Sequence, residues 1–475
     1  MSAGALPVLP LLETAKLGAP SASPARGGTG RRVYLETYGC QMNLADGEVI
    51  ASILAGAGFA ITERAEEADV VLINTCAVRE HAEERVLGRA AQLNGLRRER
   101  PHLVLGILGC MAQHLAADLP SRAPFVDLVM GPDAYRRLPE VLAQTSEEAL
   151  LHVRLCRSED YAGIDPVRSE GTNAWVTVIR GCDRFCAFCI VPYVRGRERS
   201  VPSSEVLRQV RGLAGLGFRE VTLLGQTVNS YRDGRVGFAD LLAQVAAVAG
   251  IDRVRFTSPH PADFDEATIQ AMRRIPQVCP ALHLPAQSGS DAQLEAMRRG
   301  YTVAQYRRLV ERLRQAVPDL SLTTDVVVGF CGETEEDFRR TLRLVEEVRF
   351  DAAFMFRYSE RAGTYAQRHL RDDVPGQVKA SRLQQLIDLQ EGISRQVNQR
   401  FVGRTLPVLV EGPSRRGGEA GRSWFGRSPH GKVVVFPQEA PANQEVAVRV
   451  ERATSHTLFG EVVASTPLRR DGGWC

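Results

Sequence analysis

Short apolar runs alternate with helical patterns through the first part of the chain, and this alternation is typical of an open parallel sheet. We predict strands at Val33–Leu35, Val70–Ile73, Leu103–Leu108 and Val126–Met130. Helices are predicted from Asp46 to Ala57 and from Glu80 to Arg98, with Asp133 as the cap of a later helix. Residues 31–150 are therefore predicted to form an N-terminal open parallel βα domain.

A second alternating series follows a connector at residues 151–172. Its strands are predicted at Trp175–Ile179, Glu220–Leu224, Arg253–Phe256, Ala281–Leu284, Ser321–Val327 and Ala352–Phe356. Helices are predicted between them, for example Ser204–Leu216, Ala239–Ala249 and Glu335–Glu347, and a last helix at Gln377–Arg400. Six βα units are too few for the eight-unit closed barrel. Residues 173–400 are therefore predicted to form a partial (βα)6 barrel.

The pattern changes again after residue 400. Short β-like runs are separated by Gly, Pro, Ser and Asn, at Thr405–Glu411, Arg422–Phe425, Lys432–Phe436, Glu445–Glu451 and Leu458–Val463. Closely spaced turn signals favour a small antiparallel β-barrel over residues 401–465. Residues 466–475 are predicted to be a tail.

The first 30 residues are rich in Ala, Pro, Gly and Ser. Their apolar run, Leu6–Leu12, has no basic region before it, so we predict a disordered tail and not a signal peptide. A cytoplasmic location follows.

Composition excludes two classes of protein. The 475 residues are 44% hydrophobic, which excludes wholesale disorder, and no run approaches the ~18 apolar residues of a membrane helix. The net charge is only +3, but residues 395–475 contain 12 Lys+Arg and 7 Asp+Glu, a net of +5. This basic C-terminal region is compatible with a polyanionic partner.

Three of the ten cysteines directly follow successive predicted strands. Cys40, Cys76 and Cys110 are 36 and 34 residues apart, about one βα unit each. Because the carboxyl ends of parallel strands meet at one edge of a sheet, we expect the three thiols to converge. Gly39 and Gly109 would allow a close backbone approach there. The alternative is that these cysteines act as small buried hydrophobes.

Cys182, Cys186 and Cys189 follow the first strand of the second series. Thiolates are the normal ligands of iron–sulfur clusters, and the Cys-x3-Cys-x2-Cys spacing supplies three of them. A closed electron-transfer cluster or a structural zinc site would use four protein ligands. Three thiols leave one iron open to an exogenous molecule. A structural zinc site or inert thiols are the alternatives.

This motif resembles that of the radical S-adenosylmethionine superfamily. Residues 180–186, 189–193, 195–200, 224–231 and 283–290 resemble the methylthiotransferases, and the resemblance covers residues 32–463. Residues 36–43, with Gln41-Met42 after Cys40, resemble the branch that methylthiolates isopentenyl-adenosine in tRNA, next to the anticodon on its 3′ side. The ribosomal-protein branch typically has Pro-Lys there, and the threonylcarbamoyl-adenosine branch Lys-Val. Cys331 departs from the family, which usually has proline at this position.

The resemblance implies two [4Fe-4S] clusters and S-adenosylmethionine. The cluster at Cys182, Cys186 and Cys189 would bind the cofactor and yield a 5′-deoxyadenosyl radical. The cluster at Cys40, Cys76 and Cys110 would carry the sulfur, and a second S-adenosylmethionine the methyl group. The C-terminal barrel would be an RNA-binding TRAM domain.

Individual contacts are predicted from strand ends and from basic and aromatic positions. Candidate cofactor-binding residues are Gly225, Gln226, Asn229, Gln287, Ser288 and Asp325. Candidate RNA-binding residues are Arg404, Arg422, Trp424, Arg427 and Lys432. Structural roles are the alternative for each of these residues. The segment Arg195–Arg199 could also contact phosphate, and a solvated loop is the alternative there. The expected partners of the monomer are a tRNA anticodon stem-loop, an electron donor and a sulfur source, with no membrane.

Three other functions keep the same motifs. A ribosomal-protein side chain would be the substrate in one. In another, the clusters would be structural or redox-sensing parts of a non-enzymatic RNA-binding protein. In the third, the N-terminal thiols would bind zinc. Cleavage of S-adenosylmethionine separates enzyme from binding protein, and metal analysis separates zinc from iron.

Overall fold

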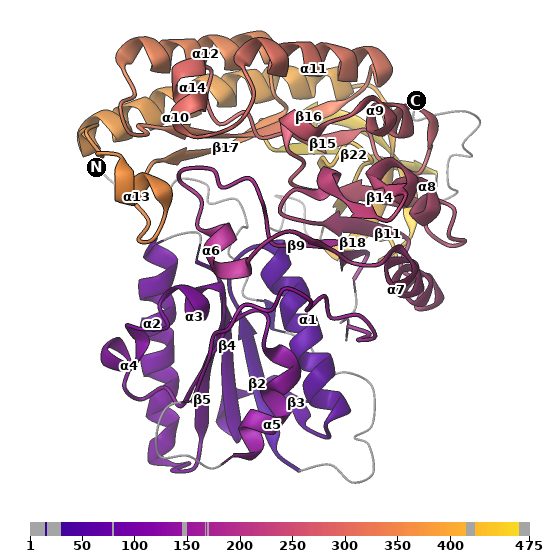
Figure 1. Cartoon of the computed structure of the whole chain (residues 1–475). Helices are drawn as coiled ribbons and strands as arrows, with labels where there is room; N and C mark the ends of the chain where they lie inside the picture. Colours follow the sequence, from indigo (N-terminus) through magenta and orange to yellow (C-terminus); the bar gives the residue numbers. More distant parts are fainter. Residues whose placement is uncertain are drawn as a thin grey trace, which may run out of the picture. The chain divides into compact units, whose positions relative to one another are not determined.

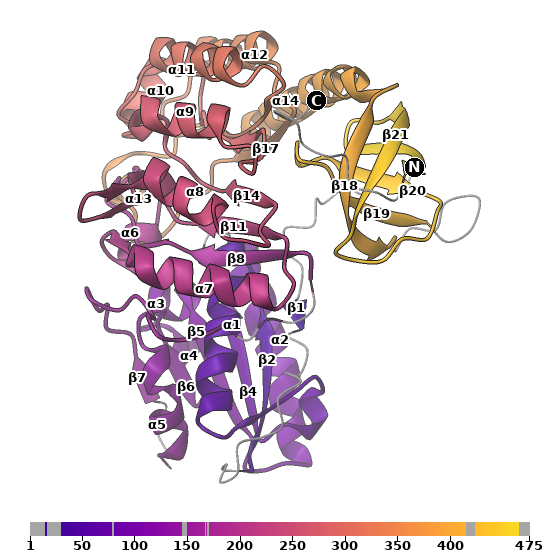
Figure 2. The ribbon, with the colours of Figure 1, turned by 90° about the vertical axis from the view of Figure 1, so that its right-hand side faces the viewer.

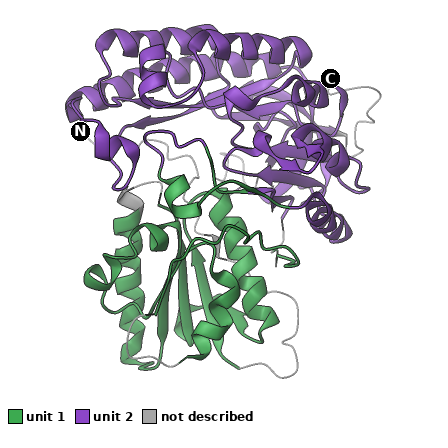
Figure 3. Ribbon diagram, viewed as in Figure 1, with its two compact units in different colours: residues 1–170, 180–183, 190–201 green, residues 171–179, 184–189, 202–475 purple. Residues whose placement is uncertain are grey.

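The computed structural model describes residues 15–16, 30–77, 80–144, 150–166, 168, 171–414 and 423–464. The chain forms two compact units (Figure 3). Unit 1 comprises residues 1–170, 180–183 and 190–201, and unit 2 comprises residues 171–179, 184–189 and 202–475. The chain therefore passes between the units within the Cys182–Cys189 motif. The predicted tails lie outside the described residues, apart from Gly30 and the short strand β1 (Ala15–Lys16).

Unit 1 contains the predicted open parallel sheet (Figure 1). Its parallel strands run in the order β2 (Arg32–Thr37), β4 (Val70–Thr75), β5 (Val104–Gly109), β6 (Leu128–Met130) and β7 (Leu150–His152). β3 (Ala60–Thr62) pairs parallel with β2, and β1 pairs antiparallel with it. The sequence missed β3 and β7 because both are short and neither is wholly buried, so they lack a continuous apolar run.

Helices cover both faces of this sheet. α1 (Gln41–Gly56) and α5 (Leu138–Ala143) pack on one face, and α2 (Glu80–Asn94), α3 (Cys110–His114) and α4 (Leu119–Arg122) on the other. Burial on both faces explains why the central strands are continuously apolar. The prediction that Asp133 caps a helix is wrong. Its carboxylate is buried, and it binds Arg199 and the backbone N–H of Cys156.

The partial barrel of unit 2 consists of two three-stranded parallel sheets within the described residues. One contains β8 (Asn173–Thr177), β11 (Glu220–Leu224) and β14 (Arg253–Phe256), and the other β15 (Ala281–His283), β16 (Ser321–Val328) and β17 (Ala352–Arg357). An isolated parallel bridge pairs Val254 of β14 with Val278, three residues before β15. The accompanying helices are α7 (Ser203–Gly215), α8 (Phe238–Ala246), α9 (Glu266–Arg274), α10 (Asp291–Ala296), α11 (Val303–Ala316), α12 (Glu335–Val348), α13 (Tyr365–His369) and α14 (Gly376–Asn398). The prediction of six βα units is confirmed.

The C-terminal strands close into a small barrel in the order β18-β19-β20-β22-β21 (Figure 2). The strands are β18 (Thr405–Pro413), β19 (Trp424–Arg427), β20 (Val433–Phe436), β21 (Glu445–Ala453) and β22 (Thr457–Ala464). The predicted antiparallel barrel is confirmed, and four of its five strand pairs are antiparallel. The exception is the pair of β20 and β22, which are parallel. A closed ring with an odd number of strands cannot alternate direction all the way round, so one parallel pair is unavoidable.

Ion pairs and hydrogen bonds attach this C-terminal barrel to the amino ends of the β-strands within unit 2. Arg253 is fully buried, and its Nη2 lies 2.6 Å from a Glu445 carboxylate oxygen. Arg404 and His430 both bind Asp319, at 2.7 Å and 2.8 Å. Burial alone would raise the pKa of Asp319, but the hydrogen bonds from His430 and Arg404 outweigh it and hold this pKa well below its usual range. The C-terminal barrel is therefore fixed to the partial barrel by charge as well as by packing.

Replacing Asp319 by Asn is expected to weaken this attachment. A carboxylate with a lowered pKa stabilises the fold above the unfolded-state pKa of about 4 and loses this effect as pH falls. We expect a loss of about 1–3 kcal/mol in the free energy of unfolding at pH 7, with the difference from wild type shrinking below about pH 4. Urea unfolding of both proteins at pH 7 and at a pH below about 4 measures this difference in the free energy of unfolding. The exposed Asp388→Asn is the control, and equal losses in the two variants would contradict the prediction.

Candidate metal centre

Three thiols lie at the carboxyl edge of three neighbouring strands of unit 1. Cys40 occupies the N-cap position of α1, three residues after β2. Cys76 directly follows β4, and Cys110 directly follows β5 and begins α3. Since β2, β4 and β5 are adjacent and parallel, the predicted convergence of the three loops is confirmed.

Two glycines allow the loops to approach one another. Gly39 has φ +123°, and a Cβ there would lie 2.4 Å from the Cβ of Cys76. Gly109 has φ +91°, and its Cβ would lie 2.5 Å from the backbone oxygen of Thr75. Any larger residue would push the cysteine loops apart, so the expected role of both glycines is confirmed.

The charge around these thiols comes from Arg195, which lies at the end of the short helix α6 (Val191–Arg195) of unit 1. Its side chain is buried, and its Nε lies 3.0 Å from Cys110 Sγ. A hydrogen bond from Cys76 lowers the pKa of Cys40, and the charge of Arg195 adds to this effect. Burial raises the pKa of Cys110 despite the same charge. Thiolates are the metal-binding form, and Arg195 is placed to balance their negative charge.

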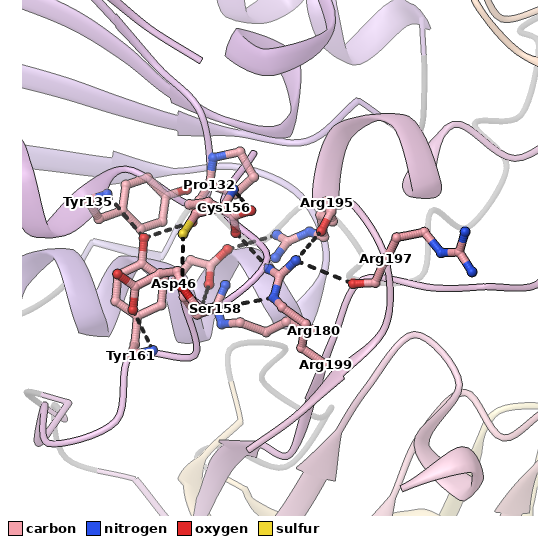
Figure 4. A network of polar contacts seen from close by, with 12 residues as sticks. Asp46, Pro132, Tyr135, Cys156, Ser158, Tyr161, Arg180, Arg195, Arg197 and Arg199 are labelled. Carbon is pink, nitrogen blue, oxygen red and sulfur yellow. Dashed lines mark hydrogen bonds and ion pairs between the residues drawn. The ribbon is translucent and has the colours of Figure 1, made fainter. Parts of the chain in front are cut away.

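Arg195 is held in place by a buried network around Asp46 (Figure 4). Asp46 is 0% exposed, and its two carboxylate oxygens bind Arg180 Nη2 at 2.5 Å and Arg195 Nη2 at 2.8 Å. Arg195 Nη2 also donates to Asn43 Oδ1 at 3.1 Å. The guanidinium of Arg180 stacks over the ring of Tyr161, 4.5 Å from its centroid. Since Asp46 and Asn43 lie on α1, the network connects the helix after Cys40 to the segment after the second cysteine motif.

The arginine-rich segment Arg195–Arg199 therefore does not behave as one solvated loop. Arg195 and Arg199 point inward to Asp46 and Asp133, and only Arg197, paired with Asp183, is mostly exposed. The prediction that Arg195 or Arg199 contacts phosphate is wrong, because both guanidinium groups form ion pairs with aspartates inside unit 1. The sequence missed Asp46 and Asn43. Their one signal was a polar residue on the apolar face of α1.

The second cysteine motif is divided between the two units. In unit 1, Cys182 is buried and its backbone N–H donates to Gly196 O at 3.1 Å. Gly181 has φ +77°, and a Cβ there would lie 2.1 Å from the backbone oxygen of Arg197. This close approach requires glycine, so the start of the motif has a fixed conformation.

In unit 2, the rest of the motif is held by backbone hydrogen bonds. Ala187 donates to Met297 O at 2.9 Å and accepts from Ala366 N–H at 2.8 Å. Cys186 is buried, and Arg299 Nη1 donates to its sulfur at 3.2 Å. Arg299 follows α10 and was not predicted as a site residue. Two adjacent arginines with no charged neighbour in the sequence gave no signal that one of them is buried.

A buried donor beside the first trio is compatible with an anionic metal cluster. Among the described residues, no three His, Cys, Asp or Glu side chains are close enough to hold one metal ion. A cluster spreads its thiolate ligands over several irons, and its sulfides accept hydrogen bonds. Arg195 Nη1 is buried and has no hydrogen-bond partner within the described part of the chain. This orphaned donor beside three thiols fits an anionic group at the edge of unit 1.

The predicted cofactor-binding residues all lie in unit 2. Gly225 is buried beneath Val228, and Asn229 is occupied by the backbone of His260 at 2.7 Å and 3.0 Å. Gln226 Oε1 is buried without a partner in the described residues.

The other predicted cofactor-binding residues follow later strands. Gln287 has φ +66°, and its backbone pairs with the backbone of Asp325. The carboxylate of Asp325 lies 3.3 Å from His283 Nε2. Ser288 is buried against Thr341. Gln226 keeps the clearest free acceptor, and the binding roles of all six stay predictions.

The predicted RNA-binding residues are mostly engaged within the protein. Lys432 is 9% exposed and its Nζ lies 2.8 Å from Asp351, so it holds the C-terminal barrel in place and is not available to RNA. Arg404 binds Asp319, and Arg427 binds Glu411 at 2.8 Å. Trp424 is partly buried against the barrel core. Arg422 lies outside the described residues.

Helices that are both long and apolar enough to cross a bilayer are absent from the described parts of the chain.

Three family models match the chain. They are "Uncharacterized protein family UPF0004" over residues 32–131, the radical SAM superfamily over residues 176–345 and the TRAM domain over residues 399–463. The matches follow the three sequence regions that hold the first cysteine trio, the second motif and the C-terminal barrel.

Relatives of known name match nearly the whole length. A tRNA-2-methylthio-N(6)-dimethylallyladenosine synthase of Porphyromonas gingivalis is 48% identical over 94% of this chain and 98% of its own. The synthase of Chloroherpeton thalassium is 46% identical over 91% and 96%. Among solved structures, the radical S-adenosylmethionine methyltransferase TsrM of Kitasatospora setae matches 69% of this chain and 75% of its own, with TM-score 0.52 and 14% identity. This likeness supports the fold.

Proposed function

Since this chain belongs to the family of tRNA-2-methylthio-N(6)-dimethylallyladenosine synthases, we propose that it converts N6-isopentenyladenosine, next to the anticodon on its 3′ side, to the 2-methylthio form. It is a radical S-adenosylmethionine enzyme that modifies tRNA by methylthiolation. The proposal extends to two [4Fe-4S] clusters, one on Cys40, Cys76 and Cys110 and one on Cys182, Cys186 and Cys189. It also keeps the prediction of a cytoplasmic monomer that recognises an anticodon stem-loop and needs an electron donor and a sulfur source.

The observation that carries the proposal is the convergence of Cys40, Cys76 and Cys110 at one sheet edge beside a buried arginine. A radical S-adenosylmethionine enzyme that only cleaves its cofactor needs the second motif alone. A second group of three thiols supports a second cluster and therefore a sulfur-transfer step. When bound, the two clusters supply one-electron chemistry and sulfur for an aromatic C–H that has no leaving group.

The protein's own residues would hold and shield these groups. Gly39 and Gly109 bring the thiol loops together, and Arg195 offsets their negative charge. Cys110 packs with Ala77, Ile190 and Val194 in an apolar cluster that excludes water. Exclusion of water strengthens each charge interaction in the site. In the C-terminal barrel, Trp424 stays a candidate for base stacking, and Arg404, Arg422 and Arg427 stay candidates for phosphate contact.

Deleting the gene is expected to remove 2-methylthio-N6-isopentenyladenosine from cellular tRNA, with accumulation of N6-isopentenyladenosine. Mass spectrometry of digested tRNA measures both nucleosides, and the intact gene on a plasmid is the control. Persistence of the methylthio nucleoside in a strain with no second gene of this family would contradict the tRNA assignment. Ribosomal proteins from the same cells would then be examined for a methylthio group.

A further inference from the structure

Each trio of cysteines has one buried arginine in contact with a sulfur atom. In unit 1, Arg195 Nε lies 3.0 Å from Cys110 Sγ, and in unit 2, Arg299 Nη1 lies 3.2 Å from Cys186 Sγ. Arg195 is 3% exposed and Arg299 6%. The two arginines come from unrelated parts of the chain, one from α6 and one from the loop after α10. The same arginine–sulfur contact therefore occurs at both trios, and different elements supply the arginine.

Neither guanidinium can turn away from its sulfur. Arg195 is fixed by Asp46 and Asn43, and Arg299 by the hydroxyl of Tyr301 at 3.3 Å and the backbone oxygen of Pro285 at 3.4 Å. The planar guanidinium can bind these partners and the sulfur together, which the single ammonium of a lysine cannot do. Arg195 Nη1 stays without a partner in the described residues and is a further donor for an anionic cluster.

A fixed N–H donor next to a ligand sulfur favours the reduced form of an iron–sulfur cluster. Reduction adds one electron to the cluster, and hydrogen bonds to its sulfurs together with nearby positive charge stabilise that added charge. The effect is strong where water is excluded, as around both arginines. It acts through the ligand sulfur, so each arginine should act on its own cluster.

We propose that Arg195 and Arg299 are positioning residues that separately raise the reduction potentials of the two clusters, Arg195 through Cys110 and Arg299 through Cys186. The inference rests on the proposed function, which places a cluster on each trio. The two arginines would then set the difference in reduction potential between the sulfur-carrying cluster and the cofactor-binding cluster.

The test uses full-length chains that retain one trio each. In one background Cys182, Cys186 and Cys189 are replaced by alanine, and in the other Cys40, Cys76 and Cys110. Arg195→Gln and Arg299→Gln are placed in both, and the midpoint potential is measured by redox titration followed by electron paramagnetic resonance. Arg197→Gln, an exposed arginine of the same segment as Arg195, is the matched control.

Each variant is expected to make reduction at least tenfold less favourable in its own background, a fall of ~59 mV for a one-electron couple, and to leave the other background unchanged. Arg195→Lys and Arg299→Lys keep the positive charge but lose the planar guanidinium with its several N–H donors. A smaller fall in the midpoint potential is therefore expected. Unchanged potentials, or equal shifts in both backgrounds, would overturn the inference. So would loss of the cluster in both the Gln and Lys variants, because the arginine would then be purely structural. Failure of either background to bind iron with both arginines intact contradicts the proposed clusters instead.

Discussion

Replacing Cys182, Cys186 and Cys189 by alanine is expected to abolish formation of 5′-deoxyadenosine from S-adenosylmethionine. Replacing Cys40, Cys76 and Cys110 is expected to leave this cleavage in place and to abolish methylthiolation of tRNA. The difference follows from the two positions. The second motif follows the first strand of the partial barrel, whereas the first trio sits on a separate sheet in unit 1. Each triple variant should retain about half of the wild-type iron, because three thiols hold one of two clusters.

Anaerobic reconstitution followed by iron analysis measures cluster content. Incubation with S-adenosylmethionine and dithionite, followed by chromatography, measures cofactor cleavage. Cys156→Ala is the matched control, because Cys156 is exposed and belongs to neither trio. Zinc in place of iron in the variant that lacks Cys182, Cys186 and Cys189, which retains the first trio, would show that the first trio is a zinc site. If the variant that lacks Cys182, Cys186 and Cys189 still cleaves the cofactor, the Cys182–Cys189 motif does not take part in this reaction.

Replacing Asp46 by alanine is expected to destabilise unit 1 by about 3–5 kcal/mol, because it leaves two buried guanidinium groups without their counter-charge. Asp46 is fully buried between Arg180 and Arg195, each of which is also almost fully buried. The loss should be accompanied by a weaker hold on Arg195 and hence on the Cys110 loop.

Urea unfolding gives the free energy, and hydrogen exchange of the α1 peptides shows whether the loss lies in unit 1. Glu140→Ala is the control, since Glu140 pairs with Arg137 on the surface with both side chains more than half exposed. An exposed pair contributes only about 0–1 kcal/mol. An Asp46→Ala loss no larger than that of Glu140→Ala would mean that the network around Asp46 does not support the fold.

Most of the strands of both βα regions could be predicted from the sequence, because buried parallel strands are continuous apolar runs and the pattern is local. β14 was predicted to the residue, and β11 as well. The edge strands β3 and β7 were missed, since each is only three residues long and partly exposed. The parallel pairing of β20 with β22 was also missed, because it follows from closure of the whole ring and no local segment encodes it.

The sequence by itself determined which residues could do chemistry. Thiols after successive strands, glycines beside two of them, and the Cys-x3-Cys-x2-Cys spacing are all local features. Only the tertiary structure decided how charge surrounds them. Arg195, Asp46 and Cys110 are each separated by more than 60 residues along the chain, and Arg299 and Cys186 by 113. A charged residue is written the same way whether it is solvated or buried, so Lys432 looked like an RNA contact and Arg195 like a loop residue. Burial, which makes these charges strong and specific, is a property of the folded chain alone.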